Sequence, residues 1–337
     1  MNKDNPNLDL LRSCAVSFVV LSHMRDFVGW GAEQEAVYRL EALGGLGVAI
    51  FFVHTTLVLL MSLERHGPAA GPFFIRRVFR IYPLAVAVVI LSALLKWREG
   101  VLTDLGELAS NLLLIQNITG HASTPRPLWT LPYELQMYLF LPALYVVTRL
   151  SQPRLRIALI CGASLALAAV AWLTSIDLHL LRFVPCFLPG ALAFVLAKRR
   201  DAQLSPIVLF GFIAVAAVVI PAIVAAGVPQ APAMMIMCLL LGLSIPLCRP
   251  VKSPPLVKCA SVVATYSYGI YLTHPLAFWL AFGGLAQAPA FVQWGVWLLM
   301  LAGLPCAAYR AVEKPGITLG IWLSNKARRV SRPRAAA

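Results

Sequence analysis

Long apolar blocks, separated by short polar connections, run along the entire chain. The 337 residues are 60% hydrophobic and 12% charged, and soluble domains carry about twice that charged fraction. Most blocks approach the ~20 residues that cross the hydrocarbon core of a bilayer as a helix. They cover residues 8–28, 43–63, 78–96, 104–118, 128–148, 155–174, 180–197, 204–226, 232–248, 261–282 and 290–311. We therefore predict an all-α, polytopic membrane helix bundle without a separate soluble domain.

The block 104–118 is shorter than most others and carries several polar side chains. If it does not cross the membrane, every basic connection falls on one side, which the positive-inside rule assigns to the cytoplasm. Those connections are 64–80, 149–156, 198–200, 249–258 and the C-terminal tail. We predict about ten transmembrane helices plus one short re-entrant or interfacial segment. The chain would then be a multi-pass protein of a bacterial inner (plasma) membrane with both termini in the cytoplasm.

The charge distribution predicts one transmembrane domain over 1–324 and a basic, disordered cytoplasmic tail over 325–337 that contacts membrane lipid. The formal net charge is +14, but it lies mainly in short connections and the tail, so we expect no nucleic-acid binding. The seven cysteines show neither metal-ligand spacing nor a disulfide framework, and we predict no metal site. The sequence also lacks a phosphate loop, a dinucleotide fingerprint and a GxSxG nucleophile elbow.

Arg12 and His23 are the unusual residues of the first apolar block. Eleven residues are close to three helical turns, so both side chains fall on one stripe, about 16 Å apart along the axis. Ionisable groups inside a membrane helix rarely face lipid. His23 could take a proton from a hydroxyl, and Arg12 could hold a phosphate. The alternative is structural: Arg12 can extend to the interface as an anchor, and His23 can hydrogen-bond within the bundle.

A second cluster combines Arg76, Arg77 and Arg80, followed closely by Tyr82. Arginines three and four residues apart lie on neighbouring positions of a helix face. Such guanidiniums at the mouth of a helix suit a polyanionic group such as a nucleotide phosphate. Determination of topology would need only positive charge, but the tight grouping with interleaved aromatics favours a ligand.

A third segment places Glu134 near the start of an apolar helix, where a carboxylate is electrostatically favoured. Tyr138 lies one turn further on the same face, and Tyr133 and Trp129 flank it. Glu134 could pair with His23 or Arg12, orient a sugar hydroxyl, or simply cap the helix. The aromatic surroundings suit a carbohydrate substrate, although aromatic residues also populate membrane interfaces.

A fourth segment contains Tyr271 and His274 within an apolar span, directly before Pro275. The proline frees a backbone carbonyl, and a kinked helix with both side chains on one side could line a substrate cavity. A structural histidine, satisfied within the bundle, is the alternative.

Taken in order, the polar segments resemble the integral-membrane acyltransferase 3 family over essentially the whole chain. The Arg-x10-His spacing of Arg12 and His23 matches the family pattern. The segments that carry the resemblance are Leu8–Arg12, Leu21–His23, Gly44–Val53, Phe74–Pro83, Leu128–Pro142, Ser267–Pro275 and Arg310–Pro315. Three positions depart from it, because Ala49 replaces a frequent Asp, His54–Thr56 replaces a common Ser-Gly, and Leu10 replaces a frequent Gly. From these changes we expect the shape of the pocket or the choice of acceptor to differ from that of typical members.

The resemblance implies an O-acyltransferase that moves an acyl group, usually acetyl, from cytoplasmic acyl-CoA to a hydroxyl of a sugar or glycan, which could be lipid-linked. We then expect His23 to act as general base and Glu134 to orient His23 or the acceptor. The donor-binding residues are expected to be Arg12, Arg76, Arg77, Arg80 and Tyr82, and the acceptor-binding residues Trp129, Tyr133, Tyr138, Tyr271 and His274. An acyl-histidine intermediate is a second route.

Two other classes of protein fit the same residues. A transporter or exporter of an anionic or glycan substrate could use the charged stripe without any chemistry. A non-catalytic scaffold is disfavoured because it has no need of costly charged groups on apolar helices. Consumption of the thioester, measured as free CoA, separates the enzyme from both.

Overall fold

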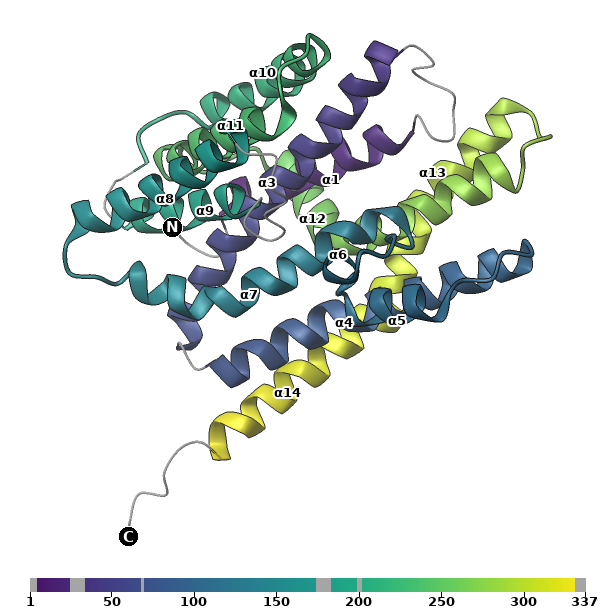
Figure 1. Ribbon diagram of the computed structural model, residues 1–337, viewed down its shortest axis with the longest axis horizontal. Helices are drawn as coiled ribbons and strands as arrows, with labels where there is room; N and C mark the ends of the chain where they lie inside the picture. Colours follow the sequence, from purple (N-terminus) through teal and green to yellow (C-terminus); the bar gives the residue numbers. More distant parts are fainter. Residues whose placement is uncertain (1–4, 25–33, 68–69, 174–182, 199–201, 331–337) are drawn as a thin grey trace.

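The computed structural model describes residues 5–24, 34–67, 70–173, 183–198 and 202–330. This part of the chain is helical and holds no β-strand beyond one isolated bridge between Leu204 and Cys248, which confirms the all-α prediction (Figure 1). Its helices are α1 (Pro6–His23), α3 (Gln34–His66), α4 (Ala70–Arg98), α5 (Leu105–Leu113), α6 (Gln116–Thr119), α7 (Thr130–Val147), α8 (Pro153–Leu173), α9 (Val184–Ala197), α10 (Pro206–Ala225), α11 (Gln230–Ser244), α12 (Pro254–Phe278), α13 (Ala290–Ala308) and α14 (Lys314–Val330). Short 3₁₀ turns cover Arg126–Trp129 and Ile245–Leu247, and π-helical turns cover Trp279–Gly283 and Tyr309–Glu313.

Six of the described helices are long and apolar enough to cross a membrane. They comprise most of α3, α4, α8, α10, α11 and the continuous α13–α14 rod. Helices α1, α7 and α12 are not among them, and these three carry His23, Glu134 and His274. The chain is thus a membrane helix bundle in which His23, Glu134 and His274 lie on helices other than these six.

The block 104–118 forms no spanning helix, as its length and polarity predicted. It splits into α5 and α6, separated by Leu114 in the left-handed conformation with φ 56°. Asp104 begins α5 by accepting a hydrogen bond from the backbone N–H of Glu107 at 3.0 Å, the usual way to satisfy a free donor at a helix start. The chain therefore returns towards α7 without crossing.

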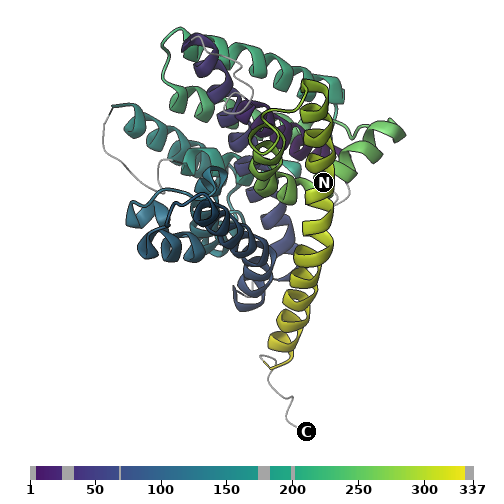
Figure 2. The same cartoon turned by 90° about the vertical axis from the view of Figure 1, so that its right-hand side faces the viewer.

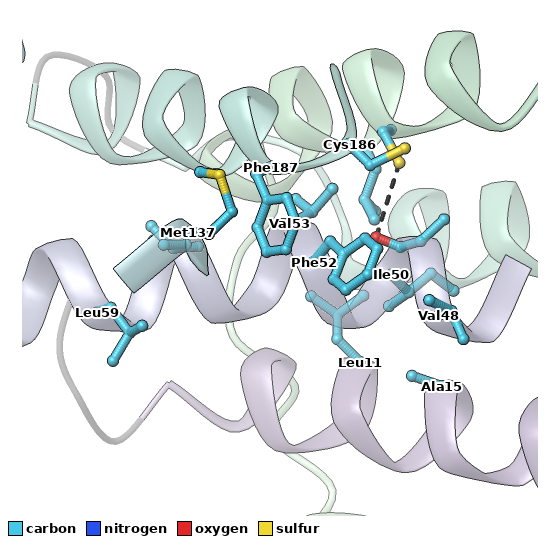
Figure 3. Close-up of a cluster of buried hydrophobic side chains, with 14 of the residues drawn as sticks. Leu11, Ala15, Val48, Ile50, Phe52, Val53, Leu59, Met137, Cys186 and Phe187 are labelled. Carbon is cyan, nitrogen blue, oxygen red and sulfur yellow. Dashed lines mark hydrogen bonds between the residues drawn. The ribbon is translucent and has the colours of Figure 1, made fainter. Parts of the chain in front are cut away.

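Helix α3 lies at the centre of the bundle and packs against α1, α9, α10, α11 and α7. Its innermost residues alternate by four and three positions, which places them along one face of the helix. They are Leu46, Ile50, Val53, Leu57 and Leu60, each fully buried. Figure 3 shows neighbours of this core: Leu11 and Ala15 come from α1, Phe187 comes from α9, and Phe52 and Val53 belong to α3.

Two glycines allow neighbouring helices to approach the backbone of this core. A Cβ atom on Gly47 would lie 2.5 Å from the carbonyl oxygen of Ala15 on α1. A Cβ atom on Gly190 of α9 would lie 2.3 Å from the carbonyl oxygen of Val53. Small residues at membrane-helix interfaces permit such close packing, and it fixes α1 and α9 against α3 at the depth of the polar cavities described below.

The C-terminal helices form a rod from Ala290 to Val330, interrupted only by the π-turn at Tyr309–Glu313 (Figure 2). Helix α14 packs along the first half of α4. It continues over residues 325–330, where the sequence placed the start of a disordered tail; residues 331–337 lie outside the described residues. The rod therefore covers the face of α4 next to the arginine cluster.

Candidate active site

A cavity of about 470 Å³ opens at the C-terminal end of α1, where His23 lies. We call it the His23 cavity. Its polar and aromatic lining includes Ser22, His23, Trp129, Tyr133, Phe183, Gln230 and Tyr271. Glu41 and Arg126, whose charged groups lie 3.8 Å apart, also line the cavity, and glycines and apolar residues, mainly of α3 and α11, complete the wall. The cavity is of the size that accepts small organic ligands.

A second cavity, of about 440 Å³, lies further along α1 towards its N-terminus. We call it the Arg12 cavity. Its charged and polar lining consists of Arg12, His54, Arg77, Arg80, Thr130, Glu134, Tyr138, Ser267 and Tyr268, among other residues. These side chains come from α1, α3, α4, α7 and α12, so tertiary packing assembles the cavity from distant segments.

The two cavities meet at a wall shared by Val48, Phe52 and Tyr271, the residues that line both. Val48 and Phe52 lie one turn apart on α3, and Tyr271 faces them from α12. The Tyr271 hydroxyl donates to the carbonyl oxygen of Pro127 at 2.6 Å and lies 2.7 Å from Oγ1 of Thr130. These bonds hold the tyrosine in place between the cavities.

The imidazole of His23 is oriented by its neighbour Ser22. The Ser22 hydroxyl donates its single proton to the carbonyl oxygen of Val19 at 2.8 Å, and its oxygen lies 3.1 Å from Nδ1 of His23. Because the serine proton is engaged, we assign the Nδ1 atom as the donor in this contact, which makes Nε2 the nitrogen with the lone pair. A neutral imidazole in this tautomer is suited to accept a proton at Nε2.

His274 lies beside His23, with ring centroids 5.0 Å apart. Its side chain is fully buried, and its Nδ1 atom lies 3.1 Å from the carbonyl oxygen of Ile270. A carbonyl can only accept, so Nδ1 carries the proton and Nε2 carries a lone pair that has no hydrogen-bond partner. The structure thus brings two imidazoles together that the sequence left in separate segments.

The Arg12 cavity concentrates charge. The Tyr138 hydroxyl donates a hydrogen bond to Glu134, and Glu134 attracts the guanidiniums of Arg12, Arg77 and Arg80. Glu313, buried at the last position of the π-turn, also attracts Arg12 and Arg80. Three guanidiniums therefore lie near two carboxyl groups, an excess of basic over acidic side chains. Such a surplus in a buried cavity suits an anionic ligand.

Glu134 belongs with Arg12 and does not reach the cavity of His23. The structure therefore does not support the prediction that Glu134 orients His23, because Phe52 and Tyr271 lie between the cavities that Glu134 and His23 line. Tyr138 likewise lines the Arg12 cavity, whereas Trp129 and Tyr133 line the His23 cavity. One helix, α7, thus serves both cavities from successive turns.

Two predicted donor-binding residues lie away from the cavities. Arg76 donates to Oγ of Ser324 at 3.1 Å, because α14 packs on that face of α4. The Tyr82 hydroxyl donates to the carbonyl oxygen of Leu113 at 3.0 Å and so links α4 to the end of α5. Neither residue lines the Arg12 cavity. Of the predicted donor-binding residues, only Arg12, Arg77 and Arg80 line it.

The aromatic residues of the His23 cavity form a compact group around Phe183. The ring of Tyr133 lies 4.7 Å from that of Phe183, and Trp129 lies 5.6 Å from it, both between centroids. Phe183 precedes α9 and carried no signal in the sequence. Two other residues were also missed as site residues: His54, noted only as a departure from the family pattern, and Tyr268, which donates to the carbonyl oxygen of Ile81 at 2.7 Å.

Fold and site together define an all-helical membrane protein in which two neighbouring imidazoles, His23 and His274, lie close to a cavity lined by arginines. A family model described as an acyltransferase domain matches residues 5–309, and the chain belongs to this family. The match covers every residue named above as lining the two cavities. It confirms the resemblance that the ordered motifs indicated.

Two curated proteins are similar to parts of the chain. The chain is similar to "Putative acetyltransferase ORF330" of Acidianus two-tailed virus, with 25% identity over 195 residues that cover 53% of this chain and 58% of the relative. It is also similar to "Nodulation protein 10" of Rhizobium leguminosarum bv. viciae, with 30% identity over 165 residues that cover 42% of this chain and 45% of the relative. The chain thus spans about half the length of these relatives. No solved structure matches it significantly.

Proposed function

We propose that the protein transfers an acyl group, with acetyl as the first candidate, from cytoplasmic acyl-CoA to a hydroxyl of a sugar or glycan. The observation that carries this proposal is the adjacency of two cavities across a shared wall, one lined by Arg12, Arg77 and Arg80 and the other by His23 and aromatic rings. A thioester donor with phosphates and a neutral hydroxyl acceptor need these two environments on either side of the reacting carbonyl.

The donor would bind in the Arg12 cavity. Arg12, Arg77 and Arg80 supply the positive charge that CoA phosphates require. The positive-inside rule assigns the neighbouring basic connection 64–80 to the cytoplasm, where acyl-CoA is found. A reporter fused after Arg200 should read as cytoplasmic, and a periplasmic reading would overturn this orientation.

The acceptor would bind in the His23 cavity. The ring group of Trp129, Tyr133 and Phe183 offers flat apolar surfaces for a sugar ring, and Gln230 offers an amide for its hydroxyls. Few polar groups set among aromatic side chains are typical of small-ligand sites. An acceptor presented as a lipid-linked or exported sugar could reach this end of the bundle.

The reaction follows from the assigned tautomer of His23. Nε2 of His23 takes the proton of the acceptor hydroxyl while the hydroxyl oxygen forms a bond to the thioester carbonyl carbon. The C–S bond then breaks, the sulfur leaves with the bonding electrons, and the CoA thiolate takes the proton from the imidazolium. Ser22 holds the ring through Nδ1. In a second route, Nε2 attacks the thioester carbonyl carbon, the C–S bond breaks and CoA leaves as a thiolate; the acceptor hydroxyl then takes the acyl group from the acyl-histidine, and its proton passes to the thiolate.

Release of free CoA from acetyl-CoA by the purified protein in lipid nanodiscs tests the proposal. General-base loss costs typically about 10²–10⁴-fold in rate, so we expect such a loss for His23→Ala in a protein that stays folded. Near-normal transfer by that variant would defeat the role of His23. A transporter would bind substrate and release no CoA. Radiolabelled acyl groups trapped on His23 in the absence of acceptor would indicate the acyl-histidine route, and mass spectrometry of surface glycans would identify the acceptor.

A further inference from the structure

We propose that the wall between the two cavities is an acyl-size filter, formed by Val48, Phe52 and Tyr271, that admits acetyl and excludes butyryl and longer chains. The inference rests on the proposed function and adds the class of donor that the site accepts. These three side chains are the residues that line both cavities. Each is nearly buried, with 7%, 3% and 7% of its surface exposed, respectively.

The donor has to reach across this wall. Arg12 and His23 lie about 16 Å apart along α1, as three turns of helix require, and they line different cavities. If the phosphates are held beside Arg12 and the hydroxyl is activated beside His23, the thioester end of the donor must lie at the junction. The acyl group is the part of the donor that meets the wall, so the wall acts on its size.

The wall is held in place on both sides. Tyr271 is fixed by its bonds to Pro127 and Thr130, and its ring meets Phe51 edge-on at 6.1 Å. Phe52 stacks on Phe187 with centroids 4.1 Å apart and rings 25° from parallel (Figure 3). Displacing either aromatic ring would break these contacts, so extra methylene groups would meet side chains that cannot move aside cheaply.

The expected discrimination between acyl groups of different length can be estimated from the effect of single methylene groups. One extra methylene in a hydrophobic site changes kcat/KM by about 10–200-fold. Butyryl exceeds acetyl by two methylenes, so we expect butyryl-CoA to react at least about 100-fold more slowly than acetyl-CoA in the unchanged protein. Val48 is the residue to vary, because Val48→Ala removes two methyl groups from the wall and leaves the hydrogen bonds of Tyr271 intact.

The experiment measures free thiol release from acetyl-, propionyl-, butyryl- and hexanoyl-CoA by the full chain in nanodiscs. Val48→Ala and Phe52→Leu should raise the ratio of butyryl to acetyl rates by about 10-fold or more. Val58→Ala and Leu59→Val are the controls, because Val58 and Leu59 line the Arg12 cavity without belonging to the wall. The controls should alter the acetyl and butyryl rates together and leave their ratio unchanged.

A wall-narrowing variant keeps the test decisive if Phe52→Leu fails to fold. Val48→Ile should lower the propionyl rate relative to the acetyl rate. Equal ratios in wall and control variants, or a butyryl rate in the unchanged protein that matches the acetyl rate, would overturn the filter while leaving acyl transfer standing. Absence of thiol release from every acyl-CoA would instead overturn the proposed function, and the filter with it.

Discussion

The hydroxyl oxygen of Ser22 lies 3.1 Å from Nδ1 of His23, its neighbour in the chain. Adjacent residues on a helix normally point about 100° apart. This contact therefore depends on the Ser22 hydroxyl turning back along the helix to donate to the carbonyl oxygen of Val19. Gly44 makes room for it, because a Cβ atom there would lie 2.4 Å from Oγ of Ser22. Three small local features thus orient one imidazole.

Ser22→Ala should lower kcat without changing the KM for the donor. A lost hydrogen bond costs about 1 kcal/mol, or roughly a fivefold rate effect when the bond orients the reacting group. Ser13→Ala is the matched control on the same helix, since Ser13 donates to the carbonyl oxygen of Asp9 far from His23. An equal drop in both variants would indicate loss of helix packing rather than of ring orientation.

Arg77→Gln and Arg80→Gln should each raise the KM for acetyl-CoA, whereas Arg76→Gln should not. Charged hydrogen bonds contribute about 1.5–3 kcal/mol, which corresponds to roughly 10–150-fold. Arg76 is the control within the same cluster because it is committed to Ser324. Initial rates over a range of acetyl-CoA concentrations give the KM of all three variants. A comparable increase in KM for Arg76→Gln would contradict the conclusion that Arg76 does not bind the donor.

Glu134→Gln should reduce stability more than Tyr138→Phe does. The first change removes a buried carboxyl group whose charge is attracted to Arg12 and Arg77, and it leaves these buried guanidiniums without that compensating charge. The second removes only the hydrogen bond from Tyr138, which contributes about 1 kcal/mol. Thermal unfolding in detergent compares them. If Glu134→Gln left the unfolding temperature unchanged and only slowed catalysis, Glu134 would act on the chemistry instead of on the arginines.

Gly190→Ala should destabilise the contact between α9 and α3. The added methyl group would lie 2.3 Å from the carbonyl oxygen of Val53, and forcing helices apart in a packed core costs about 1–3 kcal/mol. Gly211→Ala on α10 is the control, because nothing lies within 4 Å of its added Cβ atom. Unfolding temperatures measured side by side should fall only for Gly190→Ala, and equal values would contradict the close packing.

Glu107 should contribute to stability at neutral pH and lose that contribution in acid. Its pKa is lowered chiefly by the hydrogen bond from Oγ1 of Thr124 at 2.7 Å, with Lys96 also favouring the charged form. A carboxyl group whose pKa is lower in the folded protein stabilises it above the unfolded pKa, and the stabilisation fades as pH falls through the folded pKa. The unfolding temperatures of wild type and Glu107→Gln should therefore differ at pH 7 and converge in acid. A constant difference would assign the effect to packing.

The sequence was sufficient for most of the helices and for the short segment over 104–118, but not for α14 (Lys314–Val330), which lies beyond the last apolar block. Blocks of about 20 apolar residues have few folds available in a bilayer, because every backbone polar group must be bonded within the segment. The ordered motifs were equally sufficient for the family. Periodicity also placed Arg12 and His23 on one stripe of α1, and the structure keeps them there.

Periodicity could not show what faces that stripe. Phe52 of α3 and Tyr271 of α12 divide it into two cavities, so Glu134 joins Arg12 and not His23. In the same way, α14 draws Arg76 away from Arg80 through Ser324.

The sequence by itself therefore determined a membrane bundle, its family and the set of polar groups that the bilayer would not tolerate on a lipid-facing surface. Only the tertiary structure decided which of these groups share a cavity and that His274 lies against His23. The physical reason is that spacing along one helix fixes directions within that helix alone, whereas the partner of each buried charge is chosen by the packing of helices far apart in the chain.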